Sequence, residues 1–205
     1  MSTDRKTNDS RMEISFEKSD LVRELATAQG VVERKNTIPI LSSLLFEAGE
    51  SRVLITATDL DVSLRTYCAA TVKAQGACTI PARKFYDYVR LLPDGEIRIK
   101  VLENDWVQIR SGRSHTKMVG LSRKNFPSLP SFPADGAIEL PAETLRTAIG
   151  KTAFAISQEE SRYTINGALL LVQADALTMV ATDGHRLAFS ARKRPMCRLQ
   201  TKSEC

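Results

Sequence analysis

The 205-residue sequence lacks long apolar runs and closely spaced cysteines, and each absence excludes a class of protein. No apolar run approaches the roughly 20 residues of a transmembrane helix, and the polar stretch 1–11 is unlike a secretory signal peptide. The cysteines, Cys68, Cys78, Cys197 and Cys205, include no Cys-x-x-Cys pair, so we expect reduced thiols and neither disulfides nor a zinc site. These features predict a cytoplasmic protein without membrane contact, in which residues 1–11 form a disordered tail.

Recognisable catalytic and cofactor motifs are also missing. The two histidines, His115 and His185, do not have the spacing of metal ligands. The sequence contains no Gly-x-Ser-x-Gly elbow, Gly-x-Gly-x-x-Gly motif or phosphate-binding loop. Asp183 and His185 leave acid–base chemistry open, beside the alternative of a tight turn that Asp183 caps and in which Gly184 supplies a positive φ. We therefore expect no catalytic residue, no metal and no cofactor.

The net charge of +5 is confined to the two ends of the chain, because residues 12–188 are neutral overall. Residues 189–205 include Arg192-Lys193-Arg194-Pro195 and show no apolar alternation, so we predict a divergent basic tail, either disordered or a binding element. Binding of a polyanion by the body of the protein would depend on local clusters, which are otherwise solvated surface. The candidates are Arg34-Lys35, Arg83-Lys84 with Arg90, and Arg146 with Lys151.

An internal repeat organises the rest of the chain. The triplet Ala57-Thr58-Asp59 recurs as Ala181-Thr182-Asp183, and this offset of 124 residues aligns 14–64 with 138–188 without a gap. Apolar positions coincide in the two copies somewhat more often than chance predicts. The two copies also share the order of their predicted elements.

The repeated unit is predicted to be a strand, a helix and three further strands, which gives an α+β fold. In the first copy, residues 12–17 alternate like a strand, Leu21, Leu25, Ala28 and Val32 share a helical face, and runs 40–46, 52–58 and 62–70 predict strands separated by a hairpin at 47–50. The unit recurs over 78–119, with Pro81 at a helix start. A third copy is expected to begin near Ile138 and to contain a helix over 141–156.

The proline-rich segment 126–133 predicts a linker between two domains. The first domain spans residues 12–133 and the second spans 134–188. At the offset of 124, the counterpart of the region after Leu64 would begin at residue 189, so we expect the second domain to contain only its N-terminal half.

Six motifs, in the same order, closely resemble the bacterial beta sliding clamp family, the beta subunit of DNA polymerase III. They are Asn36-Thr37-Ile38-Pro39-Ile40-Leu41, Thr58-Asp59-Leu60, Pro81-Ala82-Arg83-Lys84-Phe85, Arg110-Ser111-Gly112-Arg113-Ser114, Asn125-Phe126-Pro127 and Thr182-Asp183-Gly184-His185-Arg186-Leu187-Ala188. The resemblance implies a DNA clamp fold of repeated β-α-β-β-β units, with helices lining a central hole and antiparallel sheets outside. It also implies a non-catalytic processivity factor that encircles duplex DNA and tethers the polymerase.

The resemblance also assigns roles to individual residues. It implies DNA contacts by Lys35, Arg83, Gln158, Tyr163 and Thr164, and a pocket for short peptides of the polymerase alpha subunit and the clamp loader formed by Ile165, Thr182, Gly184, His185, Arg186 and Leu187. Arg113 matches the boundary between subunits of a homo-oligomer. Because the second domain is expected to be incomplete, the alternative is a truncated clamp-like interaction protein that does not close a ring on DNA.

Overall fold

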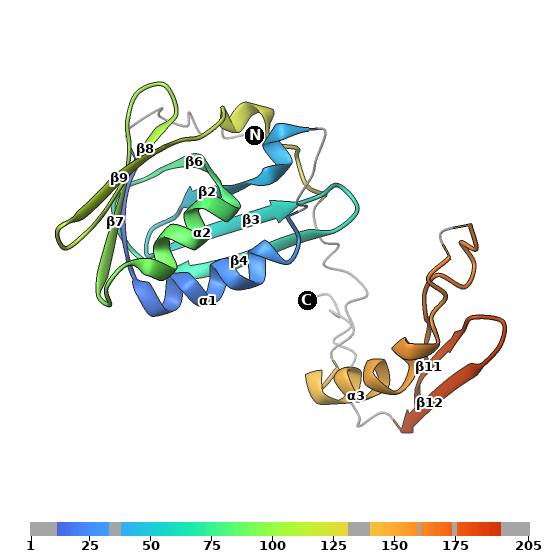
Figure 1. Ribbon diagram of the computed structural model, residues 1–205. Helices are drawn as coiled ribbons and strands as arrows, with labels where there is room; N and C mark the ends of the chain where they lie inside the picture. Colours follow the sequence, from blue (N-terminus) through green and yellow to red (C-terminus); the bar gives the residue numbers. More distant parts are fainter. Residues whose placement is uncertain (1–11, 33–37, 131–139, 160, 174–175, 194–205) are drawn as a thin grey trace, which may run out of the picture. The chain divides into compact units, whose positions relative to one another are not determined.

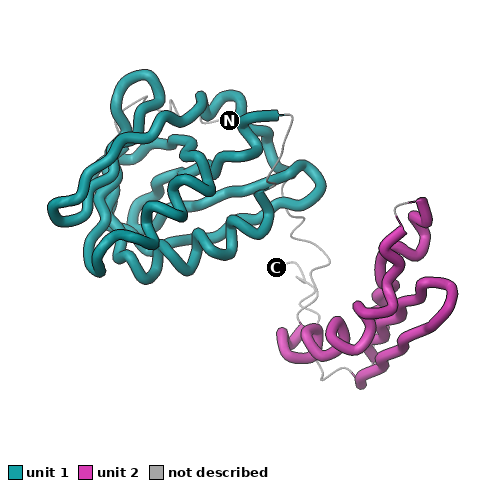
Figure 2. The backbone as a smooth tube through the Cα atoms, viewed as in Figure 1, with its two compact units in different colours: residues 1–130 teal, residues 131–205 magenta. Residues whose placement is uncertain are grey.

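The chain forms two compact units in a computed structural model that describes residues 12–32, 38–130, 140–159, 161–173 and 176–193. Unit 1 comprises Met1–Pro130 and unit 2 comprises Ser131–Cys205 (Figure 2). Within the part of the chain that the structure describes, no helix has both the length and the apolar character needed to span a bilayer.

Unit 1 contains two successive β-α-β-β-β units, as the sequence predicts (Figure 1). The first consists of β1 (Glu13–Glu17), α1 (Lys18–Gln29), β2 (Ser43–Ala48), β3 (Arg52–Thr58) and β4 (Ser63–Ala69). The second consists of β6 (Gly76–Pro81), α2 (Ala82–Leu91), β7 (Glu96–Val101), β8 (Trp106–Ser111) and β9 (Ser114–Val119). Between them lies the short strand β5 (Thr71–Ala74), which the sequence analysis did not predict, because it ended the preceding strand at residue 70.

The strands of unit 1 form two antiparallel sheets with the orders β5-β1-β7-β8-β9 and β4-β3-β2-β6. Helices α1 and α2 lie side by side across the four-stranded sheet (Figure 1). Leu21 and Leu25 of α1 are fully buried, and the ring of Phe85 from α2 packs edge-on against Phe46 of β2, with the ring centroids 5.7 Å apart. The apolar faces of both helices therefore form the core, and their polar faces stay exposed.

The start of β2 differs from the prediction. Pro39–Ser42 form a 3₁₀ turn, η1, and the strand begins at Ser43 and continues through Glu47 and Ala48, which were assigned to the hairpin. The physical reason is that proline favours the first helical position, while Ile40 and Leu41 pack with Phe126 in a small cluster of their own. Apolar burial at this point therefore does not require a strand.

Unit 2 contains α3 (Ala142–Thr152), the 3₁₀ turn η3 (Ala153–Ala155), and the antiparallel sheet β10 (Leu169–Val172), β11 (Ala176–Thr182) and β12 (Leu187–Lys193). Ala155 of η3 packs with Ala181 of β11 and Ala188 of β12 in a small buried cluster. The strand expected near Ile138 lies outside the described residues.

The offset of 124 residues relates the elements of unit 2 to those of unit 1. The bounds of β3 and β4 become those of β11 and β12, and the pair Thr58↔Ser63 becomes Thr182↔Leu187. Strand β12 thus continues to Lys193, past Ala188, where the sequence analysis placed the start of the basic tail. The alternation of β12 escaped detection because Ala188 and Ser190 are buried, whereas the larger Phe189 is exposed.

Candidate functional site

The turn between β11 and β12 is held by its own side chains. The Asp183 carboxylate accepts hydrogen bonds from the backbone N–H groups of His185, at 3.0 Å, and Arg186, at 2.9 Å. The Thr182 hydroxyl accepts from the N–H of Gly184 and donates to the carbonyl of Arg186, at 3.1 and 2.7 Å. Gly184 has a φ of +87°, which favours glycine. The tight-turn alternative from the sequence is therefore the observed arrangement.

The same contacts determine the charge of Asp183. Backbone hydrogen bonds from Arg186 and His185, together with the Arg186 guanidinium 2.9 Å from Oδ2, lower its pKa from 3.8 to about 2. A carboxylate with such a low pKa is a poor proton acceptor near neutral pH. Asp183 therefore serves as a structural acceptor for the turn rather than as a general base.

An equivalent turn joins β3 and β4 in unit 1. Asp59 Oδ1 accepts from the N–H groups of Asp61 and Val62, at 3.0 and 2.6 Å, and the Thr58 hydroxyl accepts from the N–H of Leu60. Leu60 has a φ of +83°, close to that of Gly184. The Thr-Asp pair thus stabilises the same turn in both units, and the turn of unit 2 differs by the sequence Gly184-His185-Arg186.

Around this turn, unit 2 brings together most of the residues predicted to form a peptide pocket. Leu187 is 67% exposed, and the guanidinium of Arg186 lies 5.6 Å from the ring centroid of Phe154, which is 60% exposed. The side chain of Arg162 donates to the carbonyl of Asp183 at 3.4 Å, so the loop before β10 contacts the turn. Ile165 belongs to this loop, and its carbonyl accepts from the N–H of Ser157 at 3.1 Å. The surface combines exposed apolar side chains with two guanidinium groups that are paired with Glu159 and Asp183.

Two contributors to this surface were missed by the sequence analysis as pocket residues, Phe154 and Arg162. A partial signal for Arg162 was its position three residues after Glu159, which suits an ion pair; Arg162 Nε lies 2.8 Å from the Glu159 carboxylate. For Phe154 the only signal was an aromatic residue at the end of a predicted helix, which equally suits a core position.

The predicted DNA contacts are divided between the two units. Arg83 lies in the first turn of α2 and is exposed, and Lys35 falls outside the described residues. In unit 2, Gln158, Tyr163 and Thr164 are exposed, with Tyr163 at 87%. The ion pair with Glu159 neutralises the loop's Arg162, so this loop offers hydrogen-bond donors and an aromatic ring to a phosphate chain rather than a net positive charge.

The predicted interface residue, Arg113, lies in unit 1 on the hairpin between β8 and β9. Its side chain is exposed and it follows Gly112, whose φ of +53° allows the tight reversal. Strand β9 is the last strand of its sheet, paired only with β8 among the described residues. The hairpin therefore presents a charge beside an open strand edge.

Two buried cysteines and the acidic side chains were considered as further chemical sites. Cys68 and Cys78 are free thiols, and burial raises the pKa of Cys68 to about 12 and that of Cys78 as well, which opposes formation of a reactive thiolate. In the described ranges, no group of three or more His, Cys, Asp or Glu side chains is placed to hold a metal ion.

Known proteins match both units. The family model described as DNA polymerase III beta subunit, N-terminal domain, matches residues 12–130, and that of the central domain matches residues 139–201. The Beta sliding clamp of Vibrio cholerae is 37% identical over 179 residues, which are 86% of this chain and 49% of that protein. The Beta sliding clamp of Escherichia coli K12 is 35% identical with the same coverage.

Solved structures give the same result. A Caulobacter crescentus beta sliding clamp has a TM-score of 0.83 at 36% identity, and a Bacillus subtilis DNA polymerase sliding clamp has 0.87 at 30%; each covers 92% of this chain and 52% of the solved chain. The chain thus spans about half the length of the relatives that it matches. Both family models match, and the repeated α+β architecture and repeated turn geometry agree with them. This chain therefore belongs to the DNA polymerase III beta subunit family, the bacterial beta sliding clamps.

Proposed function

We propose that this chain acts as a sliding-clamp processivity factor, a non-catalytic protein of the cytoplasm that encircles duplex DNA and tethers the replicative polymerase. The observation that carries the proposal is the succession of two family matches along one chain, in which the strand pairs β3–β4 and β11–β12 have the same bounds and register at the offset of 124. Such a protein works by topology, because a closed ring cannot leave DNA laterally but can move along it.

The charge distribution of the described residues suits a sliding contact. Residues 12–188 are neutral overall, and exposed Arg83 and Lys84 on α2 form no ion pair with another described residue. Phosphate contacts by a few such side chains are independent of sequence and weaken with salt, so they hold the duplex without fixing the protein at one position. A strong basic patch would instead slow the movement.

Closure of a ring requires contact between subunits, and unit 1 offers an edge for it. The open backbone groups of β9 can pair with a strand of a second chain and so extend the five-stranded sheet across the boundary. Arg113 stands at the end of that edge, where it can meet an acidic group of the neighbouring subunit. We propose a homo-oligomer assembled through this edge.

Partner peptides would dock at the turn of unit 2. Gly184 leaves the backbone uncovered, Leu187 and Ile165 provide apolar wall, and His185 and Arg186 form the rim. Short segments of the polymerase alpha subunit and of the clamp loader are the proposed ligands. Thr182 serves this site indirectly, since its hydroxyl fixes the turn.

Retention on circular DNA tests the clamp proposal. The full chain, loaded on nicked circular duplex DNA with a bacterial clamp loader, should co-elute with the circle at high salt and should be lost when the circle is cut once. The double variant Lys35→Ala, Arg83→Ala should reduce salt-sensitive DNA binding alike for all sequences and flatten its salt dependence. The matched control is Arg98→Ala, because Arg98 is already paired with Glu96, at 2.7 Å, on another face of the unit.

Absence of retention would reject the clamp proposal for this chain. If the chain still bound a polymerase-derived peptide under those conditions, the alternative would stand, namely a clamp-like interaction protein that does not close a ring.

A further inference from the structure

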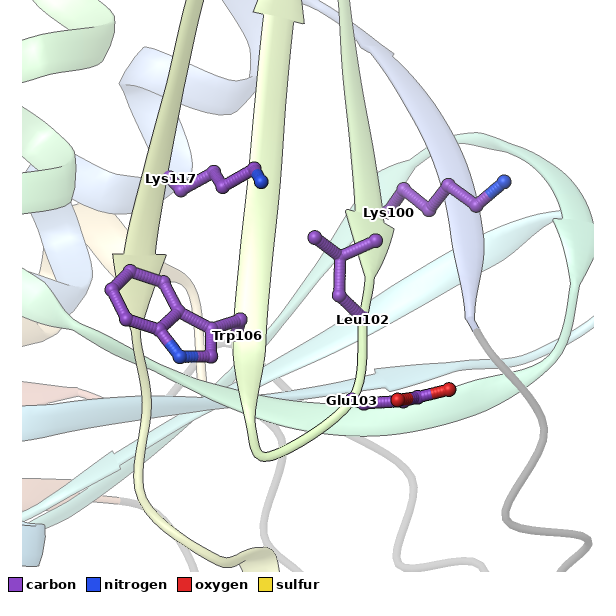
Figure 3. A pocket seen from close by; sticks show the side chains of 5 residues that line it. All are labelled: Lys100, Leu102, Glu103, Trp106 and Lys117. Carbon is purple, nitrogen blue, oxygen red and sulfur yellow. The ribbon is translucent and has the colours of Figure 1, made fainter.

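A hollow lies on the outer face of the five-stranded sheet, and none of the residues that line it has a role in the proposed function. Ile97, Ile99, Val107 and Ile109 of β7 and β8 are fully buried, so the alternate residues of these strands face away from the core. Five residues from β7, β8, β9 and the β7–β8 connection line a hollow of about 650 Å³ on this face: Lys100, Leu102, Glu103, Trp106 and Lys117 (Figure 3).

The floor of the hollow is apolar. Trp106, the one tryptophan of the sequence, is 42% exposed, and Leu102 stands next to it across the hairpin (Figure 3). Beside the hollow, Val119 of the neighbouring strand lies opposite Trp106 in the β8–β9 register and is 53% exposed. Exposed tryptophan beside aliphatic side chains is typical of the centres of protein interfaces.

The rim is mainly cationic. Lys100, Gln108 and Lys117 lie opposite one another on β7, β8 and β9, so a row of two ammonium groups crosses the sheet above the floor. Lys100 lies 3.4 Å from the Glu13 carboxylate, whereas Lys117 forms no ion pair with another described residue. Arg110 and His115 occupy the adjacent row on the same face. Glu103 is the one carboxylate in the lining.

We propose that this hollow binds an acidic peptide segment of a partner protein, with an apolar side chain on Trp106 and Leu102 and flanking carboxylates on Lys117 and Lys100. Lys100 and Lys117 lie in one row, two strand spacings or roughly 9.6 Å apart, which residues three positions apart in an extended peptide span. A nucleic acid fits less well, because every nucleotide brings a charge and the apolar floor offers no partner to a chain that is charged throughout.

This proposal is independent of the clamp function, since it needs neither a closed ring nor DNA. Trp106 makes the test direct, because the intrinsic fluorescence of the full chain reports on the site alone. The probe is a synthetic peptide in which a leucine pair is flanked on both sides by four glutamates. Its addition should shift the tryptophan emission in a saturable way, and the same peptide with glutamines in place of the glutamates should not.

Variants separate the site from the rest of the surface. With a fluorescein-labelled probe followed by anisotropy, Lys117→Ala should weaken binding roughly tenfold, the effect of one charged hydrogen bond, and Lys117→Glu should abolish it. The matched control is Lys124→Ala, an exposed lysine of the same unit outside the hollow, which should leave the affinity unchanged. Far-ultraviolet circular dichroism checks that each variant is folded.

Three results would overturn the proposal. They are an emission that does not respond to the glutamate peptide, binding that Lys117→Glu leaves intact, and a single-stranded oligothymidylate that shifts the Trp106 emission at lower concentration than the peptide. The last result would assign the surface to nucleic acid instead.

Discussion

Positions 60 and 184 show how one residue changes the accessibility of the backbone in the repeated Thr-Asp turn. Both have a positive φ, +83° for Leu60 and +87° for Gly184, and both sit in a Thr-Asp turn with the same hydrogen bonds. A side chain in this region costs roughly 1 to 2 kcal/mol, and unit 1 tolerates that cost at Leu60. In unit 2 the glycine removes the strain and leaves the backbone open to a ligand.

Gly184→Val should therefore reduce both peptide affinity and stability. The added Cβ itself meets only the flexible end of Arg162, at 3.3 Å, but a β-branched residue at positive φ is strained and its methyl groups cover the backbone. We expect a loss of about 1 to 2 kcal/mol in the free energy of unfolding and a loss of binding to a polymerase-derived peptide. Denaturant titration and fluorescence anisotropy measure the two effects.

The matched control for this variant is Leu60→Gly, which makes the corresponding backbone relief in unit 1. It should leave peptide affinity unchanged. Unaltered affinity in Gly184→Val would remove the turn from the peptide site, whatever happened to stability.

At the scale of elements, apolar periodicity predicted the helices and strands that bury one face. It missed the elements whose bounds depend on contacts with distant residues. Helix α1 and strand β3 follow from apolar spacing along the chain, and the helix predicted over 141–156 followed from the repeat, although α3 ends at Thr152. The end of β12 could not be predicted in this way, because its buried side is made of small residues. The 3₁₀ turn η1 could not be predicted either, because Ile40 and Leu41 are buried by Phe126 from the far end of the unit.

The candidate sites likewise divide into features that follow from the local sequence and features that depend on distant contacts. The Thr-Asp turn could be predicted because its hydrogen bonds join residues two to four positions apart. The contact of Arg162 with the Asp183 carbonyl joins residues 21 positions apart, and the hollow at Trp106 needs three strands in register. No local pattern contains that information.

The outer sheet faces of the two units differ in polarity. In unit 2 the face away from α3 exposes Leu169, Leu171, Leu187 and Phe189. The positions that correspond at the offset of 124 in unit 1 are Leu45, Glu47, Ser63 and Arg65. A contiguous exposed apolar face of this kind favours association with another surface.

Replacing two of these residues by their unit 1 counterparts should suppress such association. We expect Leu171→Glu with Phe189→Arg to lower the weight-average mass of the full chain at high concentration, with no loss in melting temperature, because both side chains are exposed. Sedimentation velocity over a concentration series measures the mass. The reciprocal pair in unit 1, Glu47→Leu with Arg65→Phe, should raise it.

If the apolar face is not a contact surface, the first pair will leave the concentration dependence of the mass unchanged. A fall in melting temperature would instead show that Leu171 and Phe189 support the fold of unit 2.

At the scale of the whole molecule, two kinds of self-association are distinguishable. The apolar face of unit 2 has no directional groups, so contacts through it should be indefinite and should strengthen with kosmotropic salts. Among the described residues, β9 pairs with no strand besides β8, so directional backbone contacts through its edge should give a discrete oligomer. A clamp needs the second kind.

The variant Arg113→Glu tests association through the β9 edge separately from association through the apolar face of unit 2. Reversal of the charge at the hairpin should place like charges opposite one another if an acidic group of the neighbouring subunit meets Arg113, and the discrete oligomer should dissociate at concentrations at which the parent chain is assembled. Light scattering coupled to size-exclusion chromatography gives the mass.

Lys124→Glu supplies the same change of charge away from the edge and should leave the mass unaltered. Because the proposed peptide site lies in unit 2, peptide binding should persist in Arg113→Glu, whereas retention on circular DNA should fail. An oligomer that survives Arg113→Glu would place the subunit contact elsewhere.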